Sequence, residues 1–184
     1  LFGYSVAISG DGNRIAVGDP YGPDGLDTGG IGAAETGAAP GAVRVFDWDG
    51  STWQQVGETI EGTGAAAEGA PEYFGWSVAL SSNGERVIAG STLQARAFDY
   101  DSVNGWTQTG NAIGNTDGTN GAVAISADGN RVAVGPGTLA GILGGEEESD
   151  LQIFDYDVSA GWIQVGSDDF DGEEFKGWSV AMSA

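Results

Sequence analysis

Carboxylate pairs are the residues of this sequence with the clearest capacity for chemistry. Three pairs share the same one-residue gap: Asp47 with Asp49, Asp99 with Asp101, and Asp155 with Asp157. Alternate residues of a strand face the same side, so each pair could converge on one divalent cation. Acid–base catalysis would need two carboxylates at a defined separation in a cleft, and no pair differs from its copies. The alternative is that these aspartates hydrogen-bond the backbone of turns.

Two acidic clusters occur only once each and are the candidate calcium sites. They are Asp19, Asp24 and Asp27 in one segment, and Asp168, Asp169 and Asp171 in another. Calcium takes about six to eight oxygen ligands, several of them usually carboxylates. We therefore expect no cofactor unless calcium binds at one of these clusters. The alternative is that both clusters consist of solvated loop acids.

Residues for nucleophilic catalysis are scarce. The chain has no His and no Cys, its only Lys is Lys176, and no Ser lies in a Gly-x-Ser-x-Gly elbow. A phosphate-binding loop of the Gly-x-x-x-x-Gly-Lys type is also missing. These observations predict a protein that is not an enzyme.

The charge balance excludes several partners. The 27 acidic residues outnumber the 6 basic ones, for a formal net charge of −21. Nucleic acids and anionic membrane surfaces would repel such a chain. No apolar run approaches the roughly 20 residues of a membrane-spanning helix, so we expect neither nucleic-acid binding nor membrane insertion.

Basic and aromatic residues recur at fixed places, which favours an architectural role over a unique site. Five of the six basic residues do so: Arg14, Arg86 and Arg131, then Arg44 and Arg96. We expect them to pair with acids or to pack between repeats, although a ring of anion-binding arginines is an alternative. The recurring tryptophans are Trp53, Trp106 and Trp162. They are expected in the core, with sugar stacking as the alternative.

These recurring residues belong to an internal repeat. The segments 2–18, 74–90 and 119–135 each contain an apolar Ser-Val-Ala-like stretch, a turn with Asp-Gly or Asn-Gly, an Arg and a second apolar stretch. Each is followed by an apolar–acidic segment and by a segment that begins with Trp. The alternation and the turn signals predict four short antiparallel strands per unit.

The predicted fold is therefore all-β, with four-stranded antiparallel blades stacked as part of a β-propeller. The units cover about residues 2–62, 74–114 and 119–166, and a fourth starts at 175–184. Three units and one starting strand cannot close a propeller. Further blades must come from additional sequence, or the open edges must pair with neighbouring chains.

The repeat resembles the FG-GAP repeat of integrin-α-type β-propellers. The residues that carry the resemblance are Phe2-Gly3-Tyr4-Ser5-Val6-Ala7 with Ala16-Val17-Gly18-Asp19-Pro20, and Phe74-Gly75-Trp76-Ser77-Val78-Ala79. The closest variant is that of large secreted repeat proteins with Ser-x-Asp-Gly-x-Arg turns. The third unit departs from it, because Thr119-Asn120 replace Phe-Gly. The family's calcium loop is shortened to Ser9-Gly10-Asp11-Gly12-Asn13, so that site is not expected here.

The resemblance implies an extracellular or cell-surface protein for adhesion or assembly, with protein or glycan surfaces as partners. Another non-cytosolic compartment is the alternative location. A non-catalytic module of this kind is the main functional expectation. The alternatives are a carbohydrate- or calcium-binding lectin-like propeller and a propeller hydrolase whose catalytic acids lie at the top of the barrel.

Overall fold

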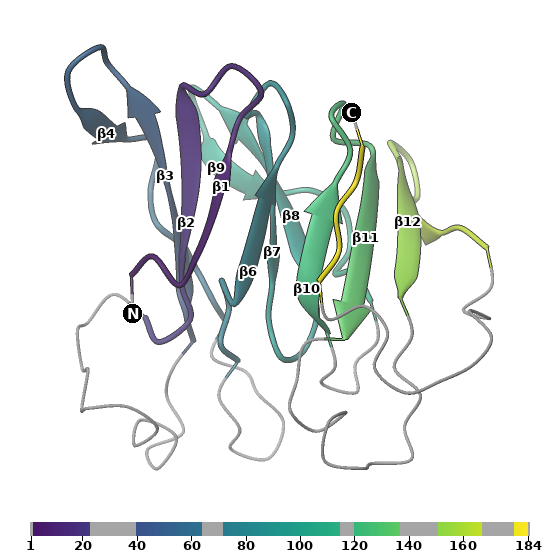
Figure 1. Ribbon diagram of the computed structural model, residues 1–184. Coiled ribbons are helices and arrows are strands. Elements are labelled where there is room, and N and C mark those ends of the chain that lie inside the picture. Colours follow the sequence, from purple (N-terminus) through teal and green to yellow (C-terminus); the bar gives the residue numbers. More distant parts are fainter. Residues whose placement is uncertain are drawn as a thin grey trace.

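The computed structural model describes residues 2–22, 40–63, 72–114, 120–136, 151–166 and 179–183. Figure 1 shows three antiparallel sheets standing side by side, in sequence order. The candidate calcium residues Asp24, Asp27, Asp168, Asp169 and Asp171 lie outside the described residues. No membrane-spanning helix occurs in the described part of the chain.

The first blade contains five strands. They are β1 (Ser5–Ile8), β2 (Arg14–Asp19), β3 (Ala42–Trp48), β4 (Trp53–Gln55) and β5 (Ile60–Glu61). The first four follow one another across the sheet, and β5 pairs with β3 beyond the short β4.

The second and third blades repeat this meander with four strands each. The second has β6 (Ser77–Leu80), β7 (Arg86–Gly90), β8 (Arg96–Asp101) and β9 (Gly105–Gln108). The third has β10 (Asn120–Ile125), β11 (Arg131–Pro136), β12 (Gln152–Asp157) and β13 (Gly161–Gln164). Ser5 pairs with Gly18 as Ser77 pairs with Gly90, so the register is also repeated. The predicted all-β blade architecture is confirmed.

The turn between the first two strands of each blade is built by its own side chains. Ser9 Oγ donates to Asp11 Oδ1 at 2.6 Å, and the backbone N–H of Asn13 donates to the same oxygen at 3.0 Å. Gly12 has a φ of 76°, in the left-handed region where glycine has no steric penalty. The same hydrogen bonds recur at Ser81 with Asn83 and at Ser126 with Asp128.

The core lies between blades. One cluster joins Val43 and Val45 of the first blade to Val78 and Val87 of the second, and another joins Ile88 of the second to the third. Each blade is a single sheet, so it can bury its faces only against the neighbouring blades. This explains why apolar residues fill both faces of the inner strands.

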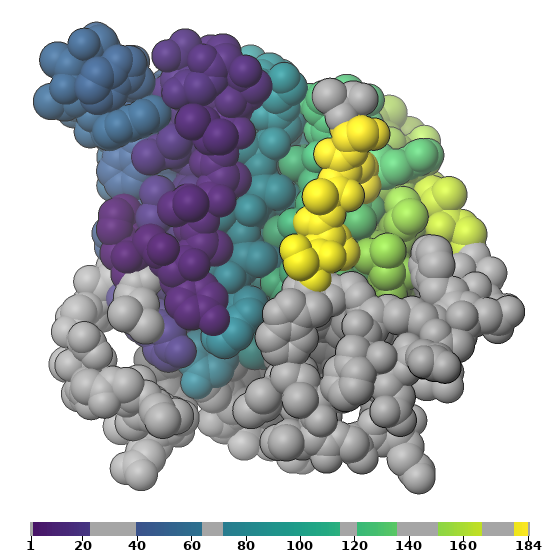
Figure 2. Space-filling view, in the orientation of Figure 1, coloured from purple at the N-terminus to yellow at the C-terminus, as the bar shows by residue number. Residues whose placement is uncertain are grey.

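The first strands of the blades lie next to one another. β6 contacts both β1 and β10, and residues 179–183, which repeat the sequence of β6, run along β10 (Figure 1). Figure 2 shows β1 and residues 179–183 at the surface of this face. This row of first strands brings together the side chains of the pocket described below.

Candidate functional site

The recurring arginines are structural. Each pairs with the first aspartate of the carboxylate pair in its own blade: Arg14 with Asp47 at 2.5 Å, Arg86 with Asp99 at 2.5 Å, and Arg131 with Asp155 at 2.6 Å. The guanidinium donates through both Nε and Nη2, which is the bidentate geometry that Arg prefers. The prediction that these arginines pair with acids is confirmed.

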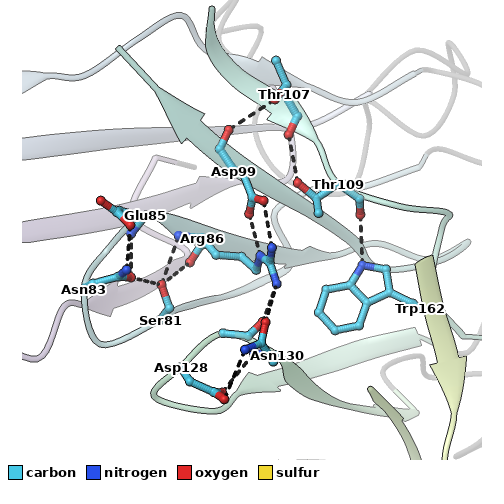
Figure 3. Close-up of polar contacts among 11 residues, drawn as sticks. Ser81, Asn83, Glu85, Arg86, Asp99, Thr107, Thr109, Asp128, Asn130 and Trp162 are labelled. Atoms are coloured by element: carbon cyan, nitrogen blue, oxygen red, sulfur yellow. Dashed lines mark hydrogen bonds and ion pairs between the residues drawn. The ribbon is translucent and has the colours of Figure 1, made fainter. Parts of the chain in front are cut away.

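The same arginines also connect neighbouring blades. Arg14 Nη1 donates to the carbonyl of Gly84 at 3.1 Å, and Arg86 Nη1 donates to that of Gly129 at 2.9 Å. Figure 3 shows Arg86 between Asp99 of its own blade and Asn130 of the next. We call this contact region between two blades the seam.

The tryptophans of the last strands also contribute to the seam. They donate to the preceding blade, whereas the arginines donate to the following one. Trp106 Nε1 donates to the carbonyl of Val56, and Trp162 Nε1 to that of Thr109, each at 2.9 Å (Figure 3 shows the second). Trp162 is buried and Trp106 half-buried, whereas Trp53 of the first blade is exposed. The predicted core position therefore holds for two of the three tryptophans.

The second aspartate of each pair caps a turn. Asp49 Oδ1 accepts hydrogen bonds from the backbone N–H groups of Ser51 and Thr52, both at 2.8 Å. These bonds lower the pKa of Asp49, because they favour the ionised carboxylate. Asp101 and Asp157 accept the equivalent bonds. The backbone alternative for these aspartates is thus the observed one.

The predicted calcium ligands lie mostly outside the described residues, so calcium binding at the two clusters stays a prediction. Of the six predicted ligands only Asp19 is described; it is buried at the end of β2, opposite Ala42 of β3. Among the described residues no three acidic side chains are grouped closely enough to hold a metal ion.

A buried ion pair that the sequence analysis did not single out joins the first two blades. Glu72 Oε1 lies 2.7 Å from Arg96 Nη2, and Glu72 Oε2 accepts a hydrogen bond from the backbone N–H of Thr63 at 2.6 Å. The Arg96 guanidinium lies 4.1 Å from the ring centroid of Phe74. Burial lowers the pKa of Arg96, and the charge of Glu72 opposes this shift. A signal existed: an arginine in an apolar strand needs a buried partner.

The candidate site is a pocket of about 290 Å³ along the row of first strands. Its described lining residues come from all three blades and from the start of the fourth repeat: Tyr4, Trp76, Ser77, Gly121, Ala122, Val123, Ser179 and Val180. Ser77 Oγ donates to the carbonyl of Gly121, which fixes the second blade to the third within the pocket wall.

Two of the described lining residues, Tyr4 and Trp76, are aromatic. The Tyr4 and Trp76 ring centroids are 4.8 Å apart, and Tyr73 lies 6.0 Å from Trp76. Burial raises the pKa of Tyr4, and the nearby Tyr21 adds to the shift, so its phenol stays neutral at physiological pH. None of the described lining residues carries a charge at that pH. The described part of the lining therefore offers no charged group to pair with an ionic ligand.

Comparison with solved structures shows the fold. A putative 6-phosphogluconolactonase from Bacteroides uniformis is 18% identical, with a TM-score of 0.51. The match covers 88% of this chain and 39% of the Bacteroides uniformis chain. A second putative 6-phosphogluconolactonase, from Bacteroides fragilis, is 17% identical, with a TM-score of 0.52. The match covers 87% of this chain and 36% of the Bacteroides fragilis chain. A protein from Lactobacillus plantarum is 12% identical, with a TM-score of 0.52. The match covers 89% of this chain and 40% of the Lactobacillus plantarum chain. The chain thus spans about two fifths of the length of these structures.

The FG-GAP resemblance is wrong. No protein-family model matches the sequence, and no curated protein matches it either. The solved structures that share the fold include putative 6-phosphogluconolactonases instead of integrin-type repeats. The Phe-Gly and Gly-Asp-Pro segments misled because tight packing between blades selects small residues. A Cβ on Gly18 would lie 2.1 Å from the carbonyl oxygen of Gly75 in the next blade.

Three further expectations are corrected with it. The non-catalytic adhesion module and the extracellular or cell-surface location followed from the integrin-type family, and the classification as not an enzyme followed from the scarcity of nucleophilic residues. Two of the solved structures that share the fold carry the name putative 6-phosphogluconolactonase, which contradicts all three expectations.

Proposed function

We propose that this chain contributes three blades to a β-propeller hydrolase, and that its pocket binds the ring of an uncharged sugar lactone or a related cyclic ester. The observation that carries the proposal is the fold likeness to the two putative 6-phosphogluconolactonases. Because the chain spans only about two fifths of those structures, the proposal assigns ring binding to these residues. The remaining catalytic parts come from elsewhere in the complete enzyme.

The pocket has the size and surface for one sugar ring. Its volume of about 290 Å³ is near the lower end of ligand pockets, which start at roughly 300 Å³. Trp76 and Tyr4, whose ring centroids lie 4.8 Å apart, provide the aromatic part of the lining, against which the C–H groups of a sugar ring can pack. The carbonyls and the hydroxyl of the Ser77–Gly121 wall offer hydrogen-bond partners for ring hydroxyls.

Charge selects against a phosphorylated substrate. A net charge of −21 repels anions, and the described lining residues include no Lys or Arg. Arg14, Arg86 and Arg96 are each engaged with a carboxylate, so their charges are already compensated. The substrate that fits is therefore a lactone without a phosphate group.

Hydrolysis of a lactone requires water to attack the carbonyl carbon, after which the ring C–O bond breaks and a hydroxy acid leaves. A base must take a proton from the attacking water. The described lining residues contain no carboxylate or imidazole. In this proposal they bind and orient the ring, while another residue provides the base.

Ring binding is tested with gluconolactam, a stable analogue of an uncharged six-membered sugar lactone, followed by tryptophan fluorescence. Trp76→Ala should weaken binding at least tenfold, whereas Trp76→Phe should recover most of it because a ring is restored. Trp53→Ala is the matched control, since this exposed indole does not line the pocket.

Turnover is measured as acid release from glucono-lactone and from its 6-phosphate. Faster hydrolysis of the neutral lactone, reduced by Trp76→Ala, supports the proposal. Binding of gluconolactam without any hydrolysis above the uncatalysed rate, in a protein that includes the remaining blades, would overturn the hydrolase assignment. Preference for the phosphorylated lactone would overturn the substrate class.

A further inference from the structure

The two seams within the chain use the same contacts at equivalent positions. At each seam an arginine of one blade donates to a turn glycine of the next and lies over its tyrosine: Arg14 with Gly84 and Tyr100, then Arg86 with Gly129 and Tyr156. The backbone takes part as well, because Gly10 N–H donates to the carbonyl of Ser82 and Ser82 N–H to that of Ala127, both at 2.8 Å. The seam is therefore a repeated interface with a defined chemistry.

The outer face of the first blade points away from the second blade and has the residues that accept these contacts at the two seams. No blade among the described residues packs against it. Val6 is 68% exposed, whereas its equivalents Val78 and Val123 are 8% and 7% exposed. Phe2 is 53% exposed, whereas Phe74 at the same repeat position is fully buried. The face thus has the side chains of an interior seam at the surface.

Hydrogen-bonding positions on this face are open too. Trp53 corresponds to Trp106 and Trp162, but its indole N–H has no acceptor among the described residues. Trp48 occupies the position of Tyr100 and Tyr156, and its ring, 5.4 Å from that of Trp53, has no arginine over it in the described part of the chain. We call the surface formed by Phe2, Val6, Ile8, Trp48 and Trp53 the open face.

We infer that the open face binds a further four-stranded blade of the same repeat, through a seam equivalent to the two inside the chain. The incoming blade supplies an arginine, held by an aspartate of its own third strand, that lies over Trp48 and donates to the carbonyl of Gly12. It also supplies the backbone carbonyl that accepts from Trp53 Nε1. Its apolar second and third strands cover Val6 and Ile8.

A second copy of this chain fits the open face less well. Its third blade would have to provide the arginine, Arg131, which is 53% exposed as a free seam requires. However, residues 179–183 already run along β10 of that blade (Figures 1 and 2). Ser179 and Val180 line the same pocket as Ala122 and Val123. They occupy the position beside β10 that β1 of the copy with the open face would need. The partner is therefore a blade whose first strand has no such neighbour.

The test places a second copy of residues 72–117 directly before Leu1 of the full chain. This keeps the spacing that separates the second blade from the third. Hydrogen exchange of the Trp53 indole N–H is followed by NMR, with Trp53→Phe to assign its signal. In the original chain this N–H should exchange much faster than those of Trp106 and Trp162. In the extended chain we expect it to exchange at least tenfold more slowly than in the original chain.

Two control variants test whether the added blade protects Trp53 through the predicted seam contacts and not through non-specific contact with the open face. Arg86→Met in the added copy removes the arginine over Trp48, and Val6→Asp introduces a charge into the open face. Each should reduce the protection of Trp53. Rapid exchange of Trp53 in the extended chain would overturn the inference. Protection of Trp53 in the original chain, rising with protein concentration together with a dimer in sedimentation, would assign the face to a second copy. The inference does not depend on the proposed function.

Discussion

The guanidinium of Arg86 lies 4.5 Å from the ring centroid of Tyr156, which belongs to the next blade. The same arginine is held by Asp99 of its own blade and donates to Gly129 across the seam. One side chain thus fixes the geometry within a blade and between two blades. The arrangement recurs at Arg14 and Tyr100, so each seam inside the chain contains one such arginine.

Arg86→Met should destabilise the chain far more than Arg131→Met. Arg86 is 14% exposed and contacts two blades, whereas Arg131 pairs only with Asp155 of its own blade among the described residues. Loss of the charge-assisted bonds and of the ring contact should cost about 2 kcal/mol for Arg86. Urea unfolding should show a lower midpoint for Arg86→Met and a nearly unchanged one for Arg131→Met. Equal effects would contradict the seam assignment.

Val78→Ala and Val6→Ala form a matched pair at one repeat position. Val78 is buried in the first seam, so removing two methyl groups should cost about 2 kcal/mol from lost burial and the resulting cavity. Val6 lies on the open face, where the same change should stay within about 0.5 kcal/mol. Thermal or urea unfolding measures both. A large effect at Val6 in the original chain would mean that its face is already covered in solution.

Asp11 should contribute to acid sensitivity. Hydrogen bonds from Ser9 and Asn13 lower its pKa from 3.8 to about 2. Because the folded pKa is the lower one, the stabilisation is complete above pH 4 and is lost as the pH falls towards 2. Asn83 makes the equivalent bonds in the second blade without titrating. Asp11→Asn should therefore keep the stability at pH 7 and lose less of it between pH 4 and pH 2, as followed by circular dichroism. An unchanged acid profile would contradict this role.

Glu72→Gln should be among the most damaging single changes. It removes the charge that compensates Arg96, and both side chains are buried. Leaving Arg96 without that charge should cost about 3 kcal/mol. The third blade has Gln152 at the position of Arg96, so Arg96→Gln in the Glu72→Gln background should restore part of the loss. A double-mutant cycle in urea measures the coupling, and additive effects would show that the pair does not interact energetically.

The repeat, the strands and the turns could be predicted from the sequence because they depend on local chemistry. Asp-Gly and Asn-Gly positions, Ser–Asp spacing and alternating apolar residues act within a few residues, and the structure has the strands in those places. The architectural role of the arginines could also be predicted, since a residue present in every unit serves what all units share. The FG-GAP resemblance was wrong, because the Phe-Gly and Gly-Asp-Pro segments of this chain reflect close packing between its blades, such as that of Gly18 against Gly75.

The sequence by itself determined that the chain is a series of small antiparallel sheets with an acidic surface. Only the tertiary structure decided which copies of a repeated side chain are buried. Val6 and Val78, or Trp53 and Trp162, are the same residue types in the same local sequence, and they differ only in whether another blade packs against them. The pocket likewise joins Tyr4, Trp76 and Val123, which are far apart in the chain. Burial depends on neighbours in space, and local sequence carries no information about which neighbour is present.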